Sequence, residues 1–510
     1  MVFSSAVFLF LFLPVVLIIN FFIPRSKVKL QNLFLFLVSS FFYFYSEQKN
    51  ILLLYFVIFL NYACGLLVYS GCTKETLQLE VGDGDKSVLK EDLLKPKTVA
   101  QKLCMTGCVI ICIGFLWYFK YINFTFDILS RIFYGRELPH IKDVTLPLGI
   151  SFYTFHVLSY SLDVYFGQMR VEKNLLNFAS YVLMFPQLVA GPIVRYRDIF
   201  RQFYHRVVTG AGFINGSRRF CFGLAKKVLI ANTLAEYVDQ IFVISPVQLS
   251  TSDCWAGAVA YTLQIYFDFG GYSDMAIGLA MLFGFHYKEN FNYPYLAKSA
   301  AEFWHRWHIS LSTWLRDYVY IHLGGNRGSK IKTCCNILFV FLCSGLWHGA
   351  NSTFVYWGLL YGCFIVLESL GLKKILQNVA VLAHFYLLLI AITGWVIFRA
   401  DNMNYACAYI MNMYGFGNAG ITDIAFTQEI AKNIVAALIA GIVLSYDWRP
   451  LYKKLVVGFA RNRNAHNAMH FHRVFAAAKF AGYLIAVALF VLSSASIISS
   501  SHNPFIYFRF

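Results

Sequence analysis

A run of 35 residues without a formal charge, residues 333–367, constrains the fold of this chain more than any other feature. A single helix of that length would extend to roughly 52 Å, whereas the hydrocarbon core of a bilayer is about 30 Å thick. We therefore predict two helices with a break at residues 348–352, His-Gly-Ala-Asn-Ser. A polar break at membrane depth is tolerated only where protein or water surrounds it, and an ionisable side chain there is a functional candidate. His348 is that side chain.

The composition excludes an ordinary soluble protein. Of the 510 residues, 58% are hydrophobic and only 14% are charged, against about 25% charged residues in soluble domains. Apolar runs recur from residues 2–24 to residues 480–508. We predict one all-α, polytopic integral-membrane domain over residues 1–510, with about 11 to 13 transmembrane segments, some of them re-entrant.

The charge distribution predicts an orientation in the membrane. Arg25, Lys27 and Lys29 directly follow the first apolar run, which places the N-terminus outside and this loop in the cytoplasm. That first run is too long for a cleavable signal peptide and has no positive charge before it. Residues 74–102 carry many charges of both signs and predict a second cytoplasmic connection, and residues 120–143 predict another polar connection.

The net charge of +17 comes mainly from basic residues at the edges of apolar runs. Membrane orientation and attraction to anionic lipid account for this pattern, and no basic soluble face suggests nucleic acid as a partner. A basic cytoplasmic rim could also attract an anionic acyl donor such as a coenzyme A thioester. The twelve cysteines form no CxxC pair, so we predict neither a disulfide framework nor a zinc site.

Residues 302–328 read EFWHRWHISLSTWLRDYVYIHLGGNRG and are more polar than their surroundings. Apolar side chains recur there at spacings of three and four, and a polar stripe lies beside them. This pattern predicts one amphipathic helix over residues 302–318, either at the membrane interface with its tryptophans at headgroup depth or in a protein cavity. The apolar stripe is Trp304, Trp307, Leu311, Trp314 and Tyr318, and the polar stripe is His305, His308, Ser312 and Arg316.

Two of the histidines are candidates for catalysis. In an apolar pocket the neutral imidazole of His348 can accept a proton from an attacking hydroxyl and return it to a leaving group. The alternative for His348 is a hydrogen bond to the helix break. His308 could orient an acyl carbonyl, bind the acceptor or help a proton relay, or it could simply be an interfacial histidine. Glu302, His305 and His308 lack the HExxH order and a further ligand, so we predict no metal.

Further side chains are weaker candidates for substrate binding. Asp268 and Asp274 lie in an apolar segment and need partners; Arg195 and Arg306 are the partners we expect, with structural pairing favoured over acceptor recognition. Two prolines and a glycine in residues 186–196 predict a broken, re-entrant segment that carries Arg195 into the protein. The remaining candidates are Trp347, Asn351 and His305.

Five separated motifs together resemble the membrane-bound O-acyltransferase (MBOAT) family, and its bacterial AlgI-type alginate O-acetylase branch most closely. The similarity extends in order over nearly the whole chain, and it implies that His348 is the essential histidine and His308 the second one. The pattern differs at His305, where the family motif FWRRWH has arginine, and this difference bears on donor binding rather than on the reaction. The motifs are PQLVAGPIVRYRD (186–198), YFDFGGYSDMAIG (266–278), FWHRWHISLSTWLRDYVYIHLGGNRG (303–328), WHGAN (347–351) and PFIYFRF (504–510).

The resemblance also implies an architecture and a reaction. A ring of helices would enclose a central funnel, where an acyl thioester such as acetyl-CoA, arriving from the cytoplasm, meets a hydroxyl from outside near His348. The implied product is an O-acetylated exopolysaccharide, made at the bacterial inner membrane with periplasmic acetyltransferase-like partner proteins and no bound cofactor. The alternatives are D-alanyl or other acyl transfer to a cell-envelope polymer, and a transporter of acyl groups or glycolipids. A transporter would be expected to show inverted repeats, and none is evident.

Overall fold

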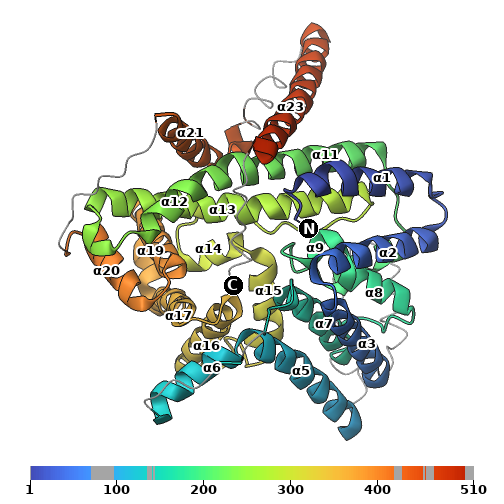
Figure 1. The fold of residues 1–510 in the computed structure, drawn as a ribbon, viewed down its shortest axis with the longest axis horizontal. Coiled ribbons are helices and arrows are strands. Elements are labelled where there is room, and N and C mark those ends of the chain that lie inside the picture. The colour runs from blue at the N-terminus through green and yellow to red at the C-terminus, as the bar shows by residue number, and fades with distance from the viewer. Residues whose placement is uncertain are drawn as a thin grey trace. The chain divides into compact units, whose positions relative to one another are not determined.

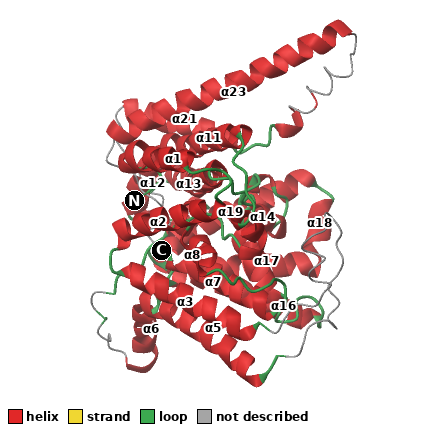
Figure 2. Ribbon diagram, turned by 90° about the vertical axis from the view of Figure 1, so that its right-hand side faces the viewer, coloured by secondary structure: helices red, strands yellow, loops and turns green. Residues whose placement is uncertain are grey.

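A computed structural model describes residues 2–69, 97–134, 140–141, 144–417, 428–451, 454 and 465–499. Within these ranges the regular elements are all helices and no strand occurs (Figure 2). The predicted all-α class is therefore confirmed. The terminal motif at 504–510 and most of the predicted loop at 74–102 lie outside the described ranges.

Seven of the described helices are long and apolar enough to cross a membrane. The sequence count of 11 to 13 segments also included apolar runs that form shorter helices buried in the protein. One such run became α7 (Ile150–Tyr165) and another became α8 (Leu175–Leu183) and α9 (Phe185–Leu188). Apolar composition alone does not separate a membrane span from a helix buried in protein. The seven are Val28–Glu47, Asn50–Val68, Val99–Lys120, Lys330–His348, Ser352–Leu376, Ala380–Arg399 and Lys479–Ser499.

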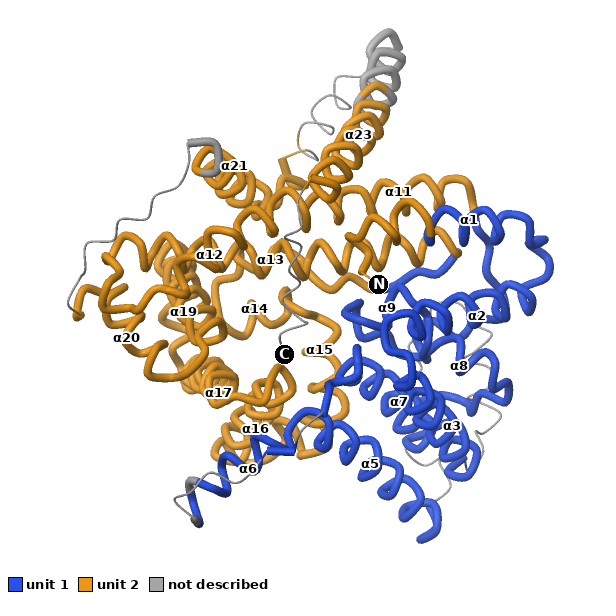
Figure 3. The backbone as a smooth tube through the Cα atoms, viewed as in Figure 1, with its two compact units in different colours: residues 1, 12–208, 284–287 blue, residues 2–11, 209–283, 288–510 orange. Residues whose placement is uncertain are grey.

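The chain forms two compact units, which Figure 3 shows in different colours. Unit 1 contains residues 1, 12–208 and 284–287, and unit 2 contains residues 2–11, 209–283 and 288–510. Unit 1 holds helices near the N-terminus: α1 (Leu13–Phe22), α2 (Val28–Glu47), α3 (Asn50–Val68), α5 (Val99–Lys120), α6 (Ile122–Leu129), α7, α8, α9 and α10 (Tyr196–Ile199).

Two expectations about connections in unit 1 need correction. Helix α5 already begins at Val99, because Thr98 and Gln101 form a reciprocal capping box. The predicted polar connection at 120–143 contains α6 and a further helical turn, Ser130–Tyr134. By contrast, the predicted broken segment is present: α9 ends at Leu188, and the buried chain is not helical again until α10.

Unit 2 is built around α13 (Thr251–Leu282), a helix of 32 residues that is buried along most of its length. Figure 1 shows α13 beside α11 (Gly210–Ala225), with which it packs. The other helices of unit 2 are α12 (Thr233–Val243), α14 (Ala300–Arg306), α15 (Ile309–Leu315), α16 (Lys330–His348), α17 (Ser352–Leu367), α18 (Lys373–Gln377), α19 (Ala380–Arg399), α20 (Met403–Met413), α21 (Gln428–Leu444) and α23 (Ala465–Ser499).

Glycines allow α11 and α13 to approach closely. A Cβ atom on Gly223 would lie 2.6 Å from the carbonyl oxygen of Gly271, and one on Gly216 would lie 2.8 Å from that of Gly278. Small residues at such contacts let two backbones meet within a membrane protein. Of the neighbouring pair Gly270-Gly271, it is Gly271 that lies at this contact.

We therefore expect Gly223→Val to destabilise the protein, because the new side chain must push α11 away from α13. Overpacking of this kind costs about 1–3 kcal/mol, and it should lower the midpoint of thermal unfolding in detergent. Gly107→Ala is the control, since no atom lies within 4 Å of a Cβ at that position of α5. An unchanged midpoint in Gly223→Val would show that the two helices can separate without loss.

Candidate active site

The predicted break in the charge-free run is present. Helix α16 ends at His348 and α17 begins at Ser352. Asn351 closes the break: its Oδ1 accepts a hydrogen bond from the Thr353 backbone amide at 3.2 Å, and its Nδ2 donates one to the Asp401 carbonyl at 2.8 Å. Asn351 therefore caps α17, and a direct contact with substrate stays a prediction.

His348 is enclosed by aromatic rings. His348 is only 3% exposed. The ring centroids of Trp347, Trp357 and Phe398 lie 5.0, 4.9 and 5.3 Å from the centroid of the imidazole. The imidazole thus lies in an apolar, largely aromatic pocket, where it could exchange a proton with a reacting hydroxyl.

The second candidate histidine lies at another helix break, which the sequence did not predict. The structure divides the expected helix at 302–318 into α14, which ends at Arg306, and α15, which begins at Ile309. Between them His308 has the left-handed backbone conformation φ 41°, ψ 54°, which costs about 1–3 kcal/mol for a residue other than glycine. Tertiary hydrogen bonds offset this cost, because the amide of Ile309 donates to the Asn290 carbonyl at 2.9 Å.

His308 is fully buried and contacts the same aromatic cluster as His348. Its ring lies 4.7 Å from Phe269 and 5.8 Å from Trp347, measured between centroids. Trp347 therefore touches both histidines. The Nδ1 atom of His308 is 3.2 Å from Asn290 Oδ1. His308 lies outside the seven candidate spans, and burial lowers the pKa of its imidazole below the ordinary value.

The tryptophans near His308 are packed inside the protein. Trp304, Trp307 and Trp314 are at most 6% exposed. Trp307 stacks on Phe303, with 5.6 Å between centroids, and also contacts Trp395 at 4.7 Å. Of the two environments the pattern allowed, the protein interior is the one that the structure shows. The apolar stripe predicted burial correctly, although the helix that carries it is broken.

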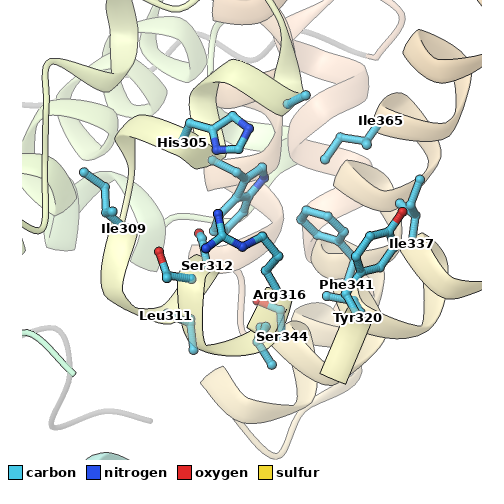
Figure 4. A pocket seen from close by; sticks show the side chains of 15 residues that line it. His305, Ile309, Leu311, Ser312, Arg316, Tyr320, Ile337, Phe341, Ser344 and Ile365 are labelled. Carbon is cyan, nitrogen blue, oxygen red and sulfur yellow. The ribbon is translucent and has the colours of Figure 1, made fainter. Parts of the chain in front are cut away.

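A cavity of about 380 Å³ lies between the segment formed by α14 and α15 and the helices α16 and α17 (Figure 4). His305, Ser312 and Arg316 line one side, and Phe341 and Ser344 line the other. Ser344 precedes His348 by one helical turn of α16. The cavity also borders Trp304, whose ring lies 5.5 Å from Trp357, a neighbour of His348.

The two acidic candidates on α13 have partners other than those expected. Asp268 forms a buried ion pair with Lys227 at 2.7 Å, and the two side chains are 2% and 1% exposed. Asp274 is bound by Arg219 at 2.8 Å and by Lys226 at 2.7 Å. The expected pairing with Arg195 or Arg306 was wrong.

The two arginines have other surroundings. Arg306 pairs with Glu302 at 2.8 Å, one helical turn away, and also donates to the Asn292 carbonyl. Arg195 is a buried residue of unit 1 immediately before α10. Neither position tests a role in substrate binding, and for both residues that role stays a prediction.

A second cavity, of about 490 Å³, reaches the asparagine that contacts His308. Its lining includes Arg219, Asp274, Asn290, Tyr293 and Arg449. Arg449 donates hydrogen bonds to the neighbouring Asp447, and these lower the pKa of that carboxyl. The charged groups of this cavity are thus engaged in ion pairs, which gives it a polar wall.

Sequence reasoning missed Asn290, Ser273 and Lys227. Asn290 and Ser273 are common polar residues, and only the packing of separate segments brings them to His308. Lys227 follows Lys226 in a basic cluster, so its burial has no local signal. No group of three or more His, Cys, Asp or Glu residues that could hold a metal occurs within the described ranges. That the protein needs no metal stays a prediction.

The fold and the site together define a class of protein. It is an all-helical membrane protein in which two buried histidines, each at a helix break, contact one tryptophan. Residues 35–376 match the model of the membrane-bound O-acyltransferase family. A probable alginate O-acetylase of Azotobacter vinelandii is 38% identical over the full length of both chains. The chain therefore belongs to this family and is an O-acyltransferase.

Two further relatives extend the comparison. A probable alginate O-acetylase of Pseudomonas aeruginosa is 41% identical over 88% of this chain and 81% of its own length. A peptidoglycan O-acetyltransferase of Helicobacter pylori is 29% identical over all of this chain and 98% of its own.

The buried pair Lys227–Asp268 generates a prediction about stability. Lys227→Met should destabilise the protein by about 3–5 kcal/mol, because it leaves the Asp268 carboxylate buried without its counter-charge. The double variant Lys227→Met, Asp268→Leu should recover most of that loss, as measured by thermal unfolding in detergent. Glu302→Gln, which removes the partly exposed pair with Arg306, should cost less than about 1 kcal/mol. Equal losses in the single and double variants would contradict this account.

Proposed function

We propose that this enzyme transfers acetyl groups across the cytoplasmic membrane for the O-acetylation of an alginate-like exopolysaccharide. The observation that carries the proposal is the placement of His348 and His308 against the same indole, Trp347, in a member of an O-acyltransferase family. The names of the relatives support a polysaccharide acceptor, because two are probable alginate O-acetylases and one is a peptidoglycan O-acetyltransferase.

The reaction needs one general base and one leaving-group acid, and a single imidazole can serve as both. His348 accepts the proton of the acceptor hydroxyl as its oxygen attacks the carbonyl carbon of an acyl thioester. The tetrahedral intermediate then collapses, the C–S bond breaks, and the imidazolium returns the proton to the departing thiolate. The products are an acetyl ester and a free thiol. His308 assists by stabilising a reacting group or relaying a proton.

The donor in this proposal is acetyl-CoA or another acyl thioester. The cavity beside Ser344 supports this part, because it combines an apolar wall with His305 and Arg316 and lies one turn from His348. His305 is therefore the tentative binding residue whose position fits best. Asp268 and Asp274 are held in ion pairs, which favours structural roles for both.

The setting of the reaction follows from the same proposal. The enzyme is a multi-pass protein of the bacterial inner membrane, and periplasmic acetyltransferase-like proteins pass the acetyl group to the polymer. D-alanyl transfer to a cell-envelope polymer is the alternative within the same chemistry, and an assay with both thioester donors separates the two. A transporter of acyl groups would keep its activity without either histidine, so histidine variants separate that class as well.

We predict that His348→Ala abolishes acetyl transfer while the protein remains folded, because the general base is lost. The measurement is transfer of labelled acetyl groups to polysaccharide by membranes with matched amounts of enzyme, with elution in detergent as the test of folding. His140→Ala is the control, since His140 is an exposed histidine paired with Asp127. Normal acetylation by folded His348→Ala would contradict the assignment.

His308→Ala should lower turnover without abolishing it. The loss of one stabilising group in an active site typically costs about 10²–10³ in rate, and the base at His348 would remain. The rate constant for acetyl transfer at saturating donor, compared with the parent enzyme, measures this effect. Full activity would mean that His308 serves only to close the break between α14 and α15.

A further inference from the structure

Asn290 is held opposite the helix break that contains His308. It belongs to the segment that connects α13 to the α14–α15 region, and it is 1% exposed. Two backbone hydrogen bonds fix this segment along the break: the amide of Ile309 donates to the Asn290 carbonyl, and the amide of Asn292 donates to the Arg306 carbonyl, each at 2.9 Å. The Asn290 side chain is thereby directed at the residues that follow the break.

The hydrogen bonds of the Asn290 amide leave only one orientation for it. The backbone N–H of Ser310 lies 3.1 Å from one end of the amide, and a backbone N–H can only donate, so that end must be the oxygen Oδ1. The Ser310 hydroxyl donates to the same oxygen at 2.9 Å. At the other end Nδ2 donates to the Ser273 hydroxyl of α13 at 3.1 Å.

This orientation determines the tautomer of His308. Its Nδ1 lies 3.2 Å from the same Oδ1, which has no hydrogen to donate. The Ser310 hydroxyl is 3.4 Å from Nδ1, but its hydrogen is donated to Oδ1, so Nδ1 carries the ring proton. A neutral imidazole has one N–H, and Nε2 is therefore the nitrogen with the free lone pair. Nε2 is buried and has no hydrogen-bond partner within the described part of the chain. It can therefore accept a hydrogen bond from a bound substrate.

We propose that Asn290 is a positioning residue that locks His308 in the Nδ1–H tautomer, so that Nε2 accepts a hydrogen bond from a hydroxyl of the acceptor substrate that lies next to the attacking one. In this tautomer Nε2 has no hydrogen to donate. His308 therefore cannot orient the acyl carbonyl, because a carbonyl oxygen only accepts hydrogen bonds. His308 then orients the acceptor through this neighbouring hydroxyl, and His348 removes the proton of the attacking hydroxyl. The catalytic consequence rests on the proposed function, whereas the tautomer does not.

The tautomer can be measured directly in the full-length enzyme. Nitrogen-15 NMR of histidine-labelled protein in lipid nanodiscs distinguishes protonated from unprotonated ring nitrogens, and the signals absent from His308→Ala identify this residue. We expect a protonated Nδ1 and an unprotonated Nε2 in the parent enzyme without substrate. A protonated Nε2 would overturn the proposal, whatever the variants do.

Substitutions at Asn290 test the control of that tautomer. Asn290→Leu removes the acceptor at similar volume and should give a mixture of tautomers or the Nε2–H form, whereas Asn290→Asp keeps an acceptor oxygen and should retain Nδ1–H. Asn336→Leu is the matched control, because Asn336 is also buried and donates to the carbonyls of Leu323 and Gly325 instead. An unchanged His308 tautomer in Asn290→Leu would overturn the positioning role.

Turnover supplies the second readout. Loss of the group that fixes the tautomer of a catalytic histidine can cost up to about 10⁴ in turnover, so we expect at least a 10²-fold loss in Asn290→Leu at saturating donor and substantial rescue in Asn290→Asp. Parental turnover in Asn290→Leu, together with a changed tautomer, would show that the tautomer does not matter for catalysis. Failure of the proposed function would appear differently, as acetyl transfer that survives His348→Ala, and it would leave the NMR result standing.

Discussion

Every backbone N–H and C=O group that is buried away from water needs a hydrogen-bond partner, and this requirement governs the surroundings of both candidate histidines. Each lies where a helix stops, and at each break an asparagine supplies the bonds that the helix no longer makes. Asn351 caps α17 after His348, and Asn290 holds the backbone and side chain around His308. A helix break without such a partner would expose polar groups to an apolar interior. Both candidate histidines thus lie where the backbone leaves the helical hydrogen-bond pattern and needs other partners.

The surroundings of the two breaks differ in a way that suits two roles. Aromatic rings enclose His348. His308 combines one aromatic face with a polar network through Asn290 and Ser273. Two carboxylates of α13 have basic partners of their own, Asp268 in the pair with Lys227 and Asp274 in the cluster with Lys226 and Arg219. The charges of these two carboxylates are therefore largely neutralised by their partners rather than by the histidines.

Much of the fold class and part of the site followed from patterns along the chain. The charge-free run exceeded the bilayer thickness, so a break near His348 was required, and the structure has it between His348 and Ser352. The aromatic stripe from Trp304 to Tyr318 predicted which face is buried, but the continuous helix was wrong. Periodicity reports which side chains share an apolar environment, and it does not report whether the backbone hydrogen bonds between them are intact.

The sequence by itself determined the membrane class, the helix pair at 333–367 and the two candidate histidines, because length, apolarity and charge are properties of neighbouring residues. Only the tertiary structure decided the partners: Lys227 for Asp268 instead of an arginine, Trp347 between the two histidines, and Asn290 for His308. A hydrogen bond or ion pair between residues tens of positions apart depends on distance and direction in space. Patterns along the sequence do not give that distance or direction, which is established only when the chain folds.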